Sequence, residues 1–128
     1  DEGIYVDYVR NYDGDTVTVD IVDLQDIDPD GTYSVLWDNM NIRVNGIDTP
    51  EIRTRCKSEK ALGKVAKYFV ADLLKNAQEV KLLNLSRGKY FRLVADVIAD
   101  GVNIADALID ADLAVPYDGR KKTYNWCK

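Results

Sequence analysis

Apolar and polar residues alternate along the first part of the chain, which is typical of β-strands with one buried face. Residues 4–9 alternate in this way, and residues 17–21 place valine or isoleucine at every second position. After the Asp-Pro-Asp-Gly turn signal at residues 28–31, a third strand is expected over residues 35–44, ending at Asn45-Gly46. The pattern predicts three strands in succession.

The spacing of apolar residues then changes to that of a helix. Between residues 61 and 74 they recur at helical spacing, with lysines on the exposed side, so we predict a helix of about five turns. Ser58 is the expected N-cap. Two more strands are predicted over residues 80–83 and 93–98, and Asn103 should cap a second helix.

This order predicts an α+β fold that is mainly β. It is a five-stranded Greek-key OB-fold barrel with a helix between strands 3 and 4 and a C-terminal helix. No repeat or linker interrupts the sequence, so residues 1–128 are predicted to form a single domain. No apolar run approaches about 18 residues, and we therefore expect no membrane partner.

The net charge of −5 is unevenly distributed. Residues 1–50 hold 12 acids and 2 bases, while residues 51–128 hold 10 acids and 15 bases. An acidic half and a basic half suit a cation site beside a surface that binds a polyanion, although unequal solvated faces would give the same count. The chain has no histidine, which excludes histidine general bases, Ser-His triads and histidine metal ligands.

Cys56 and Cys127 are the two cysteines of the chain. They are too few for a disulfide framework and lack the spacing of a metal site. Two options stay open: both thiols are free, or a disulfide joins the C-terminus to the loop before the first helix. Closing so long a loop would stabilise the fold by roughly 4 kcal/mol.

Two acid-rich turns flank an arginine and carry the candidate chemistry. Asp13-Gly14-Asp15-Thr16 precedes the second strand, and Asp48-Thr49-Pro50-Glu51 follows the third strand, which contains Arg43. Alone, each is typical of an ordinary turn, in the first case one in which glycine supplies a positive φ. On one small barrel the turns would bring carboxylates together with an arginine, which suits a hard cation beside a phosphate.

With four further segments, these turns resemble the staphylococcal nuclease family of calcium-dependent OB-fold nucleases. The matching pieces follow the family's order over almost the whole chain, which makes chance a poor explanation. They are Asp13-Gly14-Asp15-Thr16, Ile42-Arg43-Val44, Asp48-Thr49-Pro50-Glu51, Lys89-Tyr90-Phe91-Arg92, Ala107-Leu108-Ile109 and Leu113-Ala114.

The resemblance implies a metal site and a catalytic carboxylate. Asp15 and Asp48 would bind Ca²⁺ through their carboxylates, and Thr49 would bind it through its backbone carbonyl. Glu51 is similar to the family's carboxylate that positions or deprotonates the attacking water. Two carboxylates and a carbonyl leave room for waters and a phosphate oxygen around calcium, so the donor set fits the ion.

Arg43 and Arg92 resemble the two arginines that bind the scissile phosphate in the family. Two planar guanidinium groups can donate bidentately to a phosphorane-like transition state, which lysine cannot copy. The family usually has glycine before the second arginine, and here Phe91 takes its place. The orientation of the Arg92 side chain therefore depends on a local backbone whose sequence departs from the family's pattern.

The resemblance also implies substrate-binding residues, namely Lys89, Tyr90 and Tyr117, with the tyrosines lying against the bound nucleotide. The tail over residues 119–126 mixes cations with aromatic residues. Such a mixture suits contact with single-stranded nucleic acid, but Trp126 could equally cover the core while the lysines stay in water.

The acidic segment at residues 26–31 imitates the opening of a calcium loop. Its twelfth position is Trp37 rather than glutamate, and Pro29 interrupts it. We therefore interpret the segment as an acidic hairpin tip.

The resemblance implies a hydrolase that cleaves phosphodiester bonds of DNA and RNA with little sequence specificity and leaves 3′-phosphate ends. A non-catalytic OB-fold module that binds nucleic acid or protein is the alternative, and a calcium-stabilised interaction domain is a third option. We expect a monomer. A secreted or periplasmic location is expected, since calcium and a disulfide suit that setting.

Overall fold

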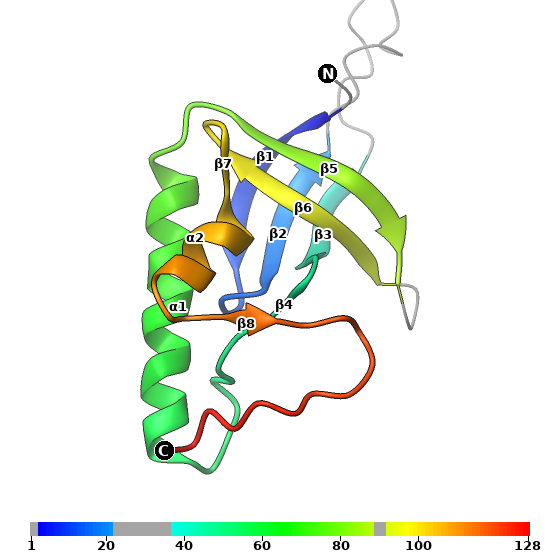
Figure 1. Cartoon of the computed structure of the whole chain (residues 1–128). Coiled ribbons are helices and arrows are strands. Elements are labelled where there is room, and N and C mark those ends of the chain that lie inside the picture. Colours follow the sequence, from blue (N-terminus) through cyan, green and yellow to red (C-terminus); the bar gives the residue numbers. More distant parts are fainter. Residues whose placement is uncertain (1–2, 22–36, 89–91) are drawn as a thin grey trace, which may run out of the picture.

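The described part of the chain forms a small β-barrel with two helices at its side (Figure 1). The computed structural model describes residues 3–21, 37–88 and 92–128. Five strands build the barrel: β1 (Ile4–Asn11), β2 (Thr16–Ile21), β3 (Trp37–Val44), β5 (Val80–Arg87) and β6 (Leu93–Ala99). The remaining elements are β4 (Ile47–Asp48), α1 (Lys57–Lys75), β7 (Val102–Asn103), α2 (Ile104–Asp110) and β8 (Val115–Pro116).

Strand pairing closes the barrel. Neighbouring strands run antiparallel in the order β3-β2-β1-β5-β6, and β3 then pairs in parallel with β6. The prediction of a mainly β, α+β OB-fold barrel is confirmed, with α1 between the third and fourth barrel strands and α2 after the fifth.

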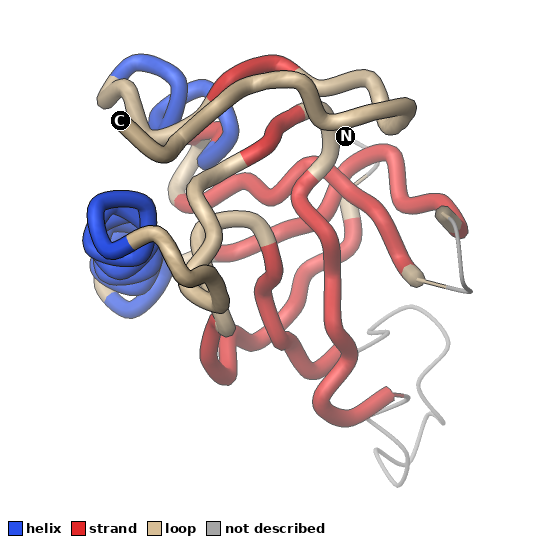
Figure 2. Tube along the Cα trace, turned by 90° about the horizontal axis from the view of Figure 1, so that it is seen from below, coloured by secondary structure: helices blue, strands red, loops and turns tan. Residues whose placement is uncertain are grey.

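The alternating residues of the strands fill the barrel interior. Val17, Val19, Ile42 and Val97 are fully buried, because each lies on the inner face of its strand. Helix α1 contributes a stripe with Val70 at its centre and packs against β1 and α2, and Figure 2 shows it end-on beside the barrel. Neither described helix is both long and apolar enough to cross a membrane.

The two helix starts differ in how well the sequence predicts them. Asn103 caps α2 as expected, since its Oδ1 accepts a hydrogen bond from the Ala105 N–H at 2.9 Å. The prediction of Ser58 as the cap of α1 is wrong, because the cap is Cys56. The Cys56 backbone is extended, its N–H donates to Thr54 Oγ1 at 3.2 Å, and its side chain makes no capping bond. The 19 residues of α1 agree with the predicted five turns.

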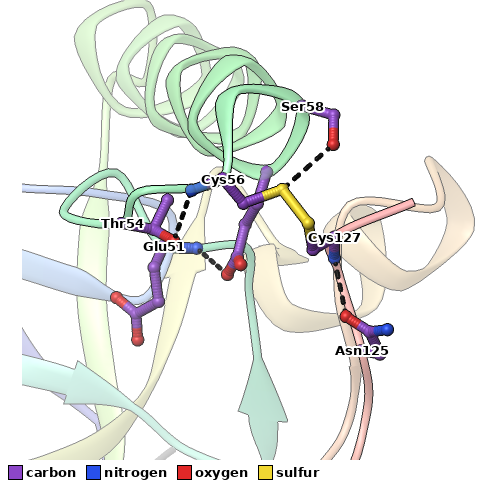
Figure 3. The surroundings of a disulfide bond; sticks show 7 residues. Glu51, Thr54, Cys56, Ser58, Asn125 and Cys127 are labelled. Atoms are coloured by element: carbon purple, nitrogen blue, oxygen red, sulfur yellow. Dashed lines mark hydrogen bonds between the residues drawn. A yellow bond between two sulfur atoms is a disulfide. The ribbon is translucent and has the colours of Figure 1, made fainter.

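Cys56 and Cys127 form a disulfide with their Cα atoms 5.9 Å apart, which decides between the two options left open by the sequence (Figure 3). The bond fastens the C-terminal tail, defined here as residues 117–128, to the start of α1. In Figure 1 the tail leaves β8, passes below the barrel and returns to the lower end of α1. The tail therefore lies at the same end of the molecule as the segment between β4 and α1.

Three predictions fall outside the described residues. They concern the acidic hairpin tip at residues 26–31, the substrate-binding residues Lys89 and Tyr90, and the effect of Phe91 on the backbone before Arg92.

Candidate functional site

The turn before β2 and the end of β3 meet at one end of the barrel. In the β2–β3 ladder Thr16 lies opposite Arg43, and the Val44 N–H donates to the Asp15 carbonyl at 2.9 Å. This register brings Arg43 Nη1 to 2.9 Å from Asp15 Oδ2. Arg43 Nη2 donates to the Ile47 carbonyl at 2.9 Å, so one guanidinium joins the Asp15 turn to β4.

Close packing also joins the two acid-rich turns. A Cβ atom on Gly14 would lie 3.1 Å from Thr49 Cγ2 and 3.0 Å from Ala66 Cβ on α1. The expectation that this glycine supplies a positive φ is wrong: among the described residues, the glycines with positive φ are Gly46, Gly101 and Gly119. Gly14 instead lacks a side chain because its two neighbours occupy that space.

Helix α1 fixes the segment that carries Glu51. A Cβ atom on Gly63 would lie 2.9 Å from the Glu51 carbonyl, so the helix and this segment touch backbone to backbone. The Glu51 N–H donates to Glu59 Oε2 at 2.9 Å, a bond drawn as a dashed line in Figure 3. The Glu51 backbone is thereby held while its carboxylate stays half-exposed.

Asp48 and Glu51 share a cation from the C-terminal tail. Lys122 Nζ lies 3.2 Å from Asp48 Oδ1 and 3.1 Å from Glu51 Oε1. Partial burial acts to lower the pKa of Lys122, but its bonds to Glu51 and Asp48 outweigh this and raise that pKa above its usual value. The second Asp48 oxygen, Oδ2, accepts a hydrogen bond from the Trp126 indole N–H at 3.2 Å.

Asp13 is a further buried carboxyl group in the first turn. Its Oδ1 accepts the Asp15 N–H at 3.1 Å, and Asn11 Nδ2 donates to its backbone carbonyl at 3.0 Å. Burial, followed by the negative charges of Asp15 and Glu51, raises the pKa of Asp13 to about 7. Burial is the largest cause, and the neighbouring carboxylates add negative potential, which favours a bound cation.

A groove of about 560 Å³ opens beside these carboxylates. Arg92 enters it just before β6, next to β3, because Leu93 pairs with Ile42. The guanidinium carbon of Arg43 lies 5.7 Å from the centre of the Tyr117 ring. The groove is lined by Arg43, Val44, Asn45, Gly46, Gly88, Arg92, Val94, Tyr117, Asp118, Gly119 and Lys122.

The structure thus brings most of the sequence-predicted residues together. Asp15, Asp48, Thr49 and Glu51 belong to the two contacting turns, and the guanidinium of Arg43 lies between them. Arg43, Arg92 and Tyr117 share the groove. The groove therefore places cationic and aromatic groups next to the acidic cluster.

The donor atoms fit a hard cation. Within residues 3–21, 37–88 and 92–128, the buried side-chain atoms without a hydrogen-bond partner are Arg43 Nη1, Asp48 Oδ1 and Thr49 Oγ1. The first two have ion-pair contacts that lack hydrogen-bond alignment. No three His, Cys, Asp or Glu side chains of the described part gather as a metal cluster. Calcium accepts about six to eight oxygen ligands, including carbonyls and waters, so two carboxylates suffice as its charged ligands.

Sequence reasoning missed Lys122 and Trp126 as members of the acidic cluster. They contact residues 71 and 78 positions earlier in the chain, a distance that no local pattern spans. The basic and aromatic composition of the tail was the available signal, and it suggested contact with nucleic acid or cover for the core instead.

Comparison with known proteins bears on the same part of the chain. The family model described as Staphylococcal nuclease homologue matches residues 41–126. The match includes Arg43, Asp48, Glu51 and Arg92, and it begins after the turn that carries Asp15. A search of curated proteins finds no match to the sequence.

Proposed function

Because this chain belongs to the family of staphylococcal nuclease homologues, we propose that it is a calcium-dependent nuclease acting on DNA and RNA with little sequence specificity. One observation carries the proposal: the cluster around Asp15, Asp48 and Glu51 adjoins a groove lined by Arg43 and Arg92. A cation site beside two guanidinium groups suits the binding of a phosphodiester.

In this proposal Asp15 and Asp48 hold Ca²⁺ through their carboxylates, and Thr49 holds it through its backbone carbonyl. When bound, the ion would polarise a phosphoryl oxygen and favour hydroxide nearby. Asp48 Oδ1 has no hydrogen-bond partner and contacts the Lys122 ammonium, and the carboxylates of Asp13 and Asp15 lie together in the first turn, which supports a cation site here. Burial is consistent with such a site, because Asp15 and Asp48 are each less than one tenth exposed, and buried carboxylates are paired with cations or coordinate metals.

Glu51 is the proposed base, or positioner, of the attacking water. The chain has no histidine, and the Glu51 carboxylate is the proposed proton acceptor in its place. Its backbone is fixed by Glu59 and by the close approach of Gly63, while its carboxylate remains half-exposed. A fixed backbone with an accessible carboxylate suits proton transfer from a water molecule.

Arg43 and Arg92 are proposed to stabilise the charge that develops on the phosphate. Arg43 is already oriented by Asp15 and the Ile47 carbonyl, so little reorganisation is needed during the reaction. Arg92 is exposed, and its guanidinium is available to a ligand. Tyr117 contributes a ring against which a base or sugar can pack. Departure of the 5′-oxygen would leave 3′-phosphate ends.

We also propose a location and an oligomeric state. The Cys56–Cys127 disulfide supports a secreted or periplasmic protein, because such bonds persist in oxidising compartments. The groove and the acidic cluster are complete within one copy of the chain, which supports activity as a monomer.

The test uses labelled single-stranded DNA, duplex DNA and single-stranded RNA, each with calcium or with a chelator. Cleavage is expected in calcium alone. Glu51→Gln should lower kcat by about 10²- to 10⁴-fold with little effect on KM, the range expected for loss of a general base. Glu79→Gln is the matched control, since Glu79 is exposed and precedes β5.

The outcomes separate the candidate functions. Binding of nucleic acid without cleavage would indicate the non-catalytic OB-fold module, and calcium-dependent stability without either activity would indicate an interaction domain. If Glu51→Gln and Arg43→Ala cleave as fast as the parent protein, the proposed site is wrong.

A further inference from the structure

The Trp126 side chain is held against a proposed metal ligand. Its indole N–H donates to Asp48 Oδ2 at 3.2 Å, and both residues are less than one tenth exposed. An indole nitrogen donates one hydrogen bond and accepts none, so in this buried position it requires a fixed acceptor. The bond therefore restrains the orientation of the Asp48 carboxylate.

The two oxygens of Asp48 have different partners. Oδ2 is bound to the neutral indole, whereas Oδ1 contacts the Lys122 ammonium without hydrogen-bond alignment. A neutral donor does not repel an incoming cation, but an ammonium group does. The indole can therefore remain in place when a cation binds, whereas the Lys122 ammonium has to move away from Oδ1 before the cation can bind there.

Trp126 in turn is anchored by its neighbours in the tail. Cys127 is disulfide-bonded to Cys56 at the start of α1, and the Cys127 N–H donates to Asn125 Oδ1 at 2.9 Å (Figure 3). The Tyr124 ring lies edge-on to the indole, with 4.5 Å between ring centres. The indole position is thus set by covalent and packing contacts that do not involve Asp48.

We propose that Trp126 is a positioning residue that holds the Asp48 carboxylate ready for calcium, and that the Cys56–Cys127 disulfide keeps Trp126 in place. This inference rests on the proposed function, since it takes Asp48 as a calcium ligand. Substituting a residue that hydrogen-bonds to a metal ligand and orients it typically lowers metal affinity by about 10- to 100-fold.

The test is a calorimetric titration of calcium into the full chain without nucleic acid. Trp126→Phe keeps a ring but removes the N–H, and it should bind calcium about 10- to 100-fold more weakly than the parent. Tyr124→Phe is the control, because it keeps the Trp126–Asp48 bond and should bind calcium like the parent. The nuclease activity of Trp126→Phe should return at high calcium, with kcat close to that of the parent.

A second measurement does not depend on the folding of Trp126→Phe. In a Trp37→Phe background, Trp126 is the remaining tryptophan, and its emission should change on calcium addition. The change should disappear in the same background with Asp48→Asn. Reduction of the disulfide should weaken calcium binding in the same direction as Trp126→Phe.

The positioning role would be overturned if folded Trp126→Phe bound calcium as tightly as the parent. It would also be overturned if Trp126 fluorescence did not change on calcium addition while calorimetry detected binding. A parent protein that binds no calcium would overturn both this role and the proposed metal site. A parent that binds calcium but cleaves nothing would overturn the nuclease proposal alone. The titration and the cleavage assay together therefore distinguish failure of the positioning role from failure of the nuclease proposal.

Discussion

Arg43 Nη1 lies 2.9 Å from Asp15 Oδ2, and this ion pair connects β3 to the turn before β2. Both side chains are largely buried, so Arg43 contributes to the fold as well as to the groove. Arg92 lines the same groove but is exposed, and its guanidinium makes no hydrogen bond or ion pair with the residues that the structure describes. The two arginines should therefore respond differently to substitution.

Arg43→Ala and Arg92→Ala should each lower kcat by about 10²- to 10³-fold, the loss typical when one transition-state donor is removed. Only Arg43→Ala should also destabilise the fold, by about 3 kcal/mol, because it leaves Asp15 buried without its counter-charge. Urea unfolding in chelator measures the stability, and single-turnover cleavage in calcium measures the rate. Arg120→Ala, at an exposed tail position, is the control.

Equal destabilisation by the two alanine substitutions would show that Arg92 also holds the fold together. Full activity of Arg92→Ala would remove it from the proposed catalytic set.

Lys122 should compete with calcium for the carboxylates of Asp48 and Glu51. Lys122→Met removes the ammonium, and calcium should then bind up to about five-fold more tightly, because a half-exposed ion pair is worth at most about 1 kcal/mol. Calorimetric titration measures the affinity. Lys121→Met is the matched control, since Lys121 is exposed and carries the same charge. Weaker binding by Lys122→Met would show that the ammonium supports the site instead of competing for it.

The predictable features are those that local sequence encodes. Alternating residues such as Val17 and Val19 face the barrel interior as expected, and Asn103 caps α2. The strands β4 and β8 have two residues each, which is too few to show the alternation of apolar and polar residues that predicts a strand. They form because Ile47 pairs with Pro116 across the fold. These short strands hold Asp48 in place, so local pattern does not encode the geometry around it.

Local sequence likewise does not predict where α1 starts or what the tail contacts. Ser58 has the chemistry of a cap, but the disulfide and the Thr54 hydroxyl fix the backbone two residues earlier, at Cys56. Trp126 reaches Asp48 because the disulfide brings the end of the tail back to the helix start. Long-range closure therefore decides which side chains complete the acidic cluster.

Asp13 should make the calcium-free protein less stable as the pH rises. Its pKa is raised to about 7 in the fold, from a value of 3.8 for a free side chain. The unfolded chain releases this proton near pH 4 and the folded chain keeps it to about pH 7, so the group progressively disfavours folding between these values. Asp13→Asn keeps an Oδ1 acceptor for the Asp15 N–H but cannot ionise.

Urea unfolding in chelator, at several pH values between about 4 and 8, checks this expectation. The stability gained by Asp13→Asn over the parent should increase up to about pH 7 and then stay level. A difference that is constant across the range would contradict the raised pKa.

Reduction of the Cys56–Cys127 disulfide should destabilise the protein by about 4 kcal/mol. The bond spans 71 positions, and opening it returns that loop to the unfolded ensemble with the corresponding chain entropy. Urea unfolding of the oxidised and reduced protein in chelator measures the difference, and the double variant Cys56→Ser/Cys127→Ser should match the reduced parent. Reductant should leave the double variant unchanged. A loss below about 1 kcal/mol would contradict this chain-entropy explanation, because opening the loop would then add little more entropy to the unfolded chain than to the folded protein.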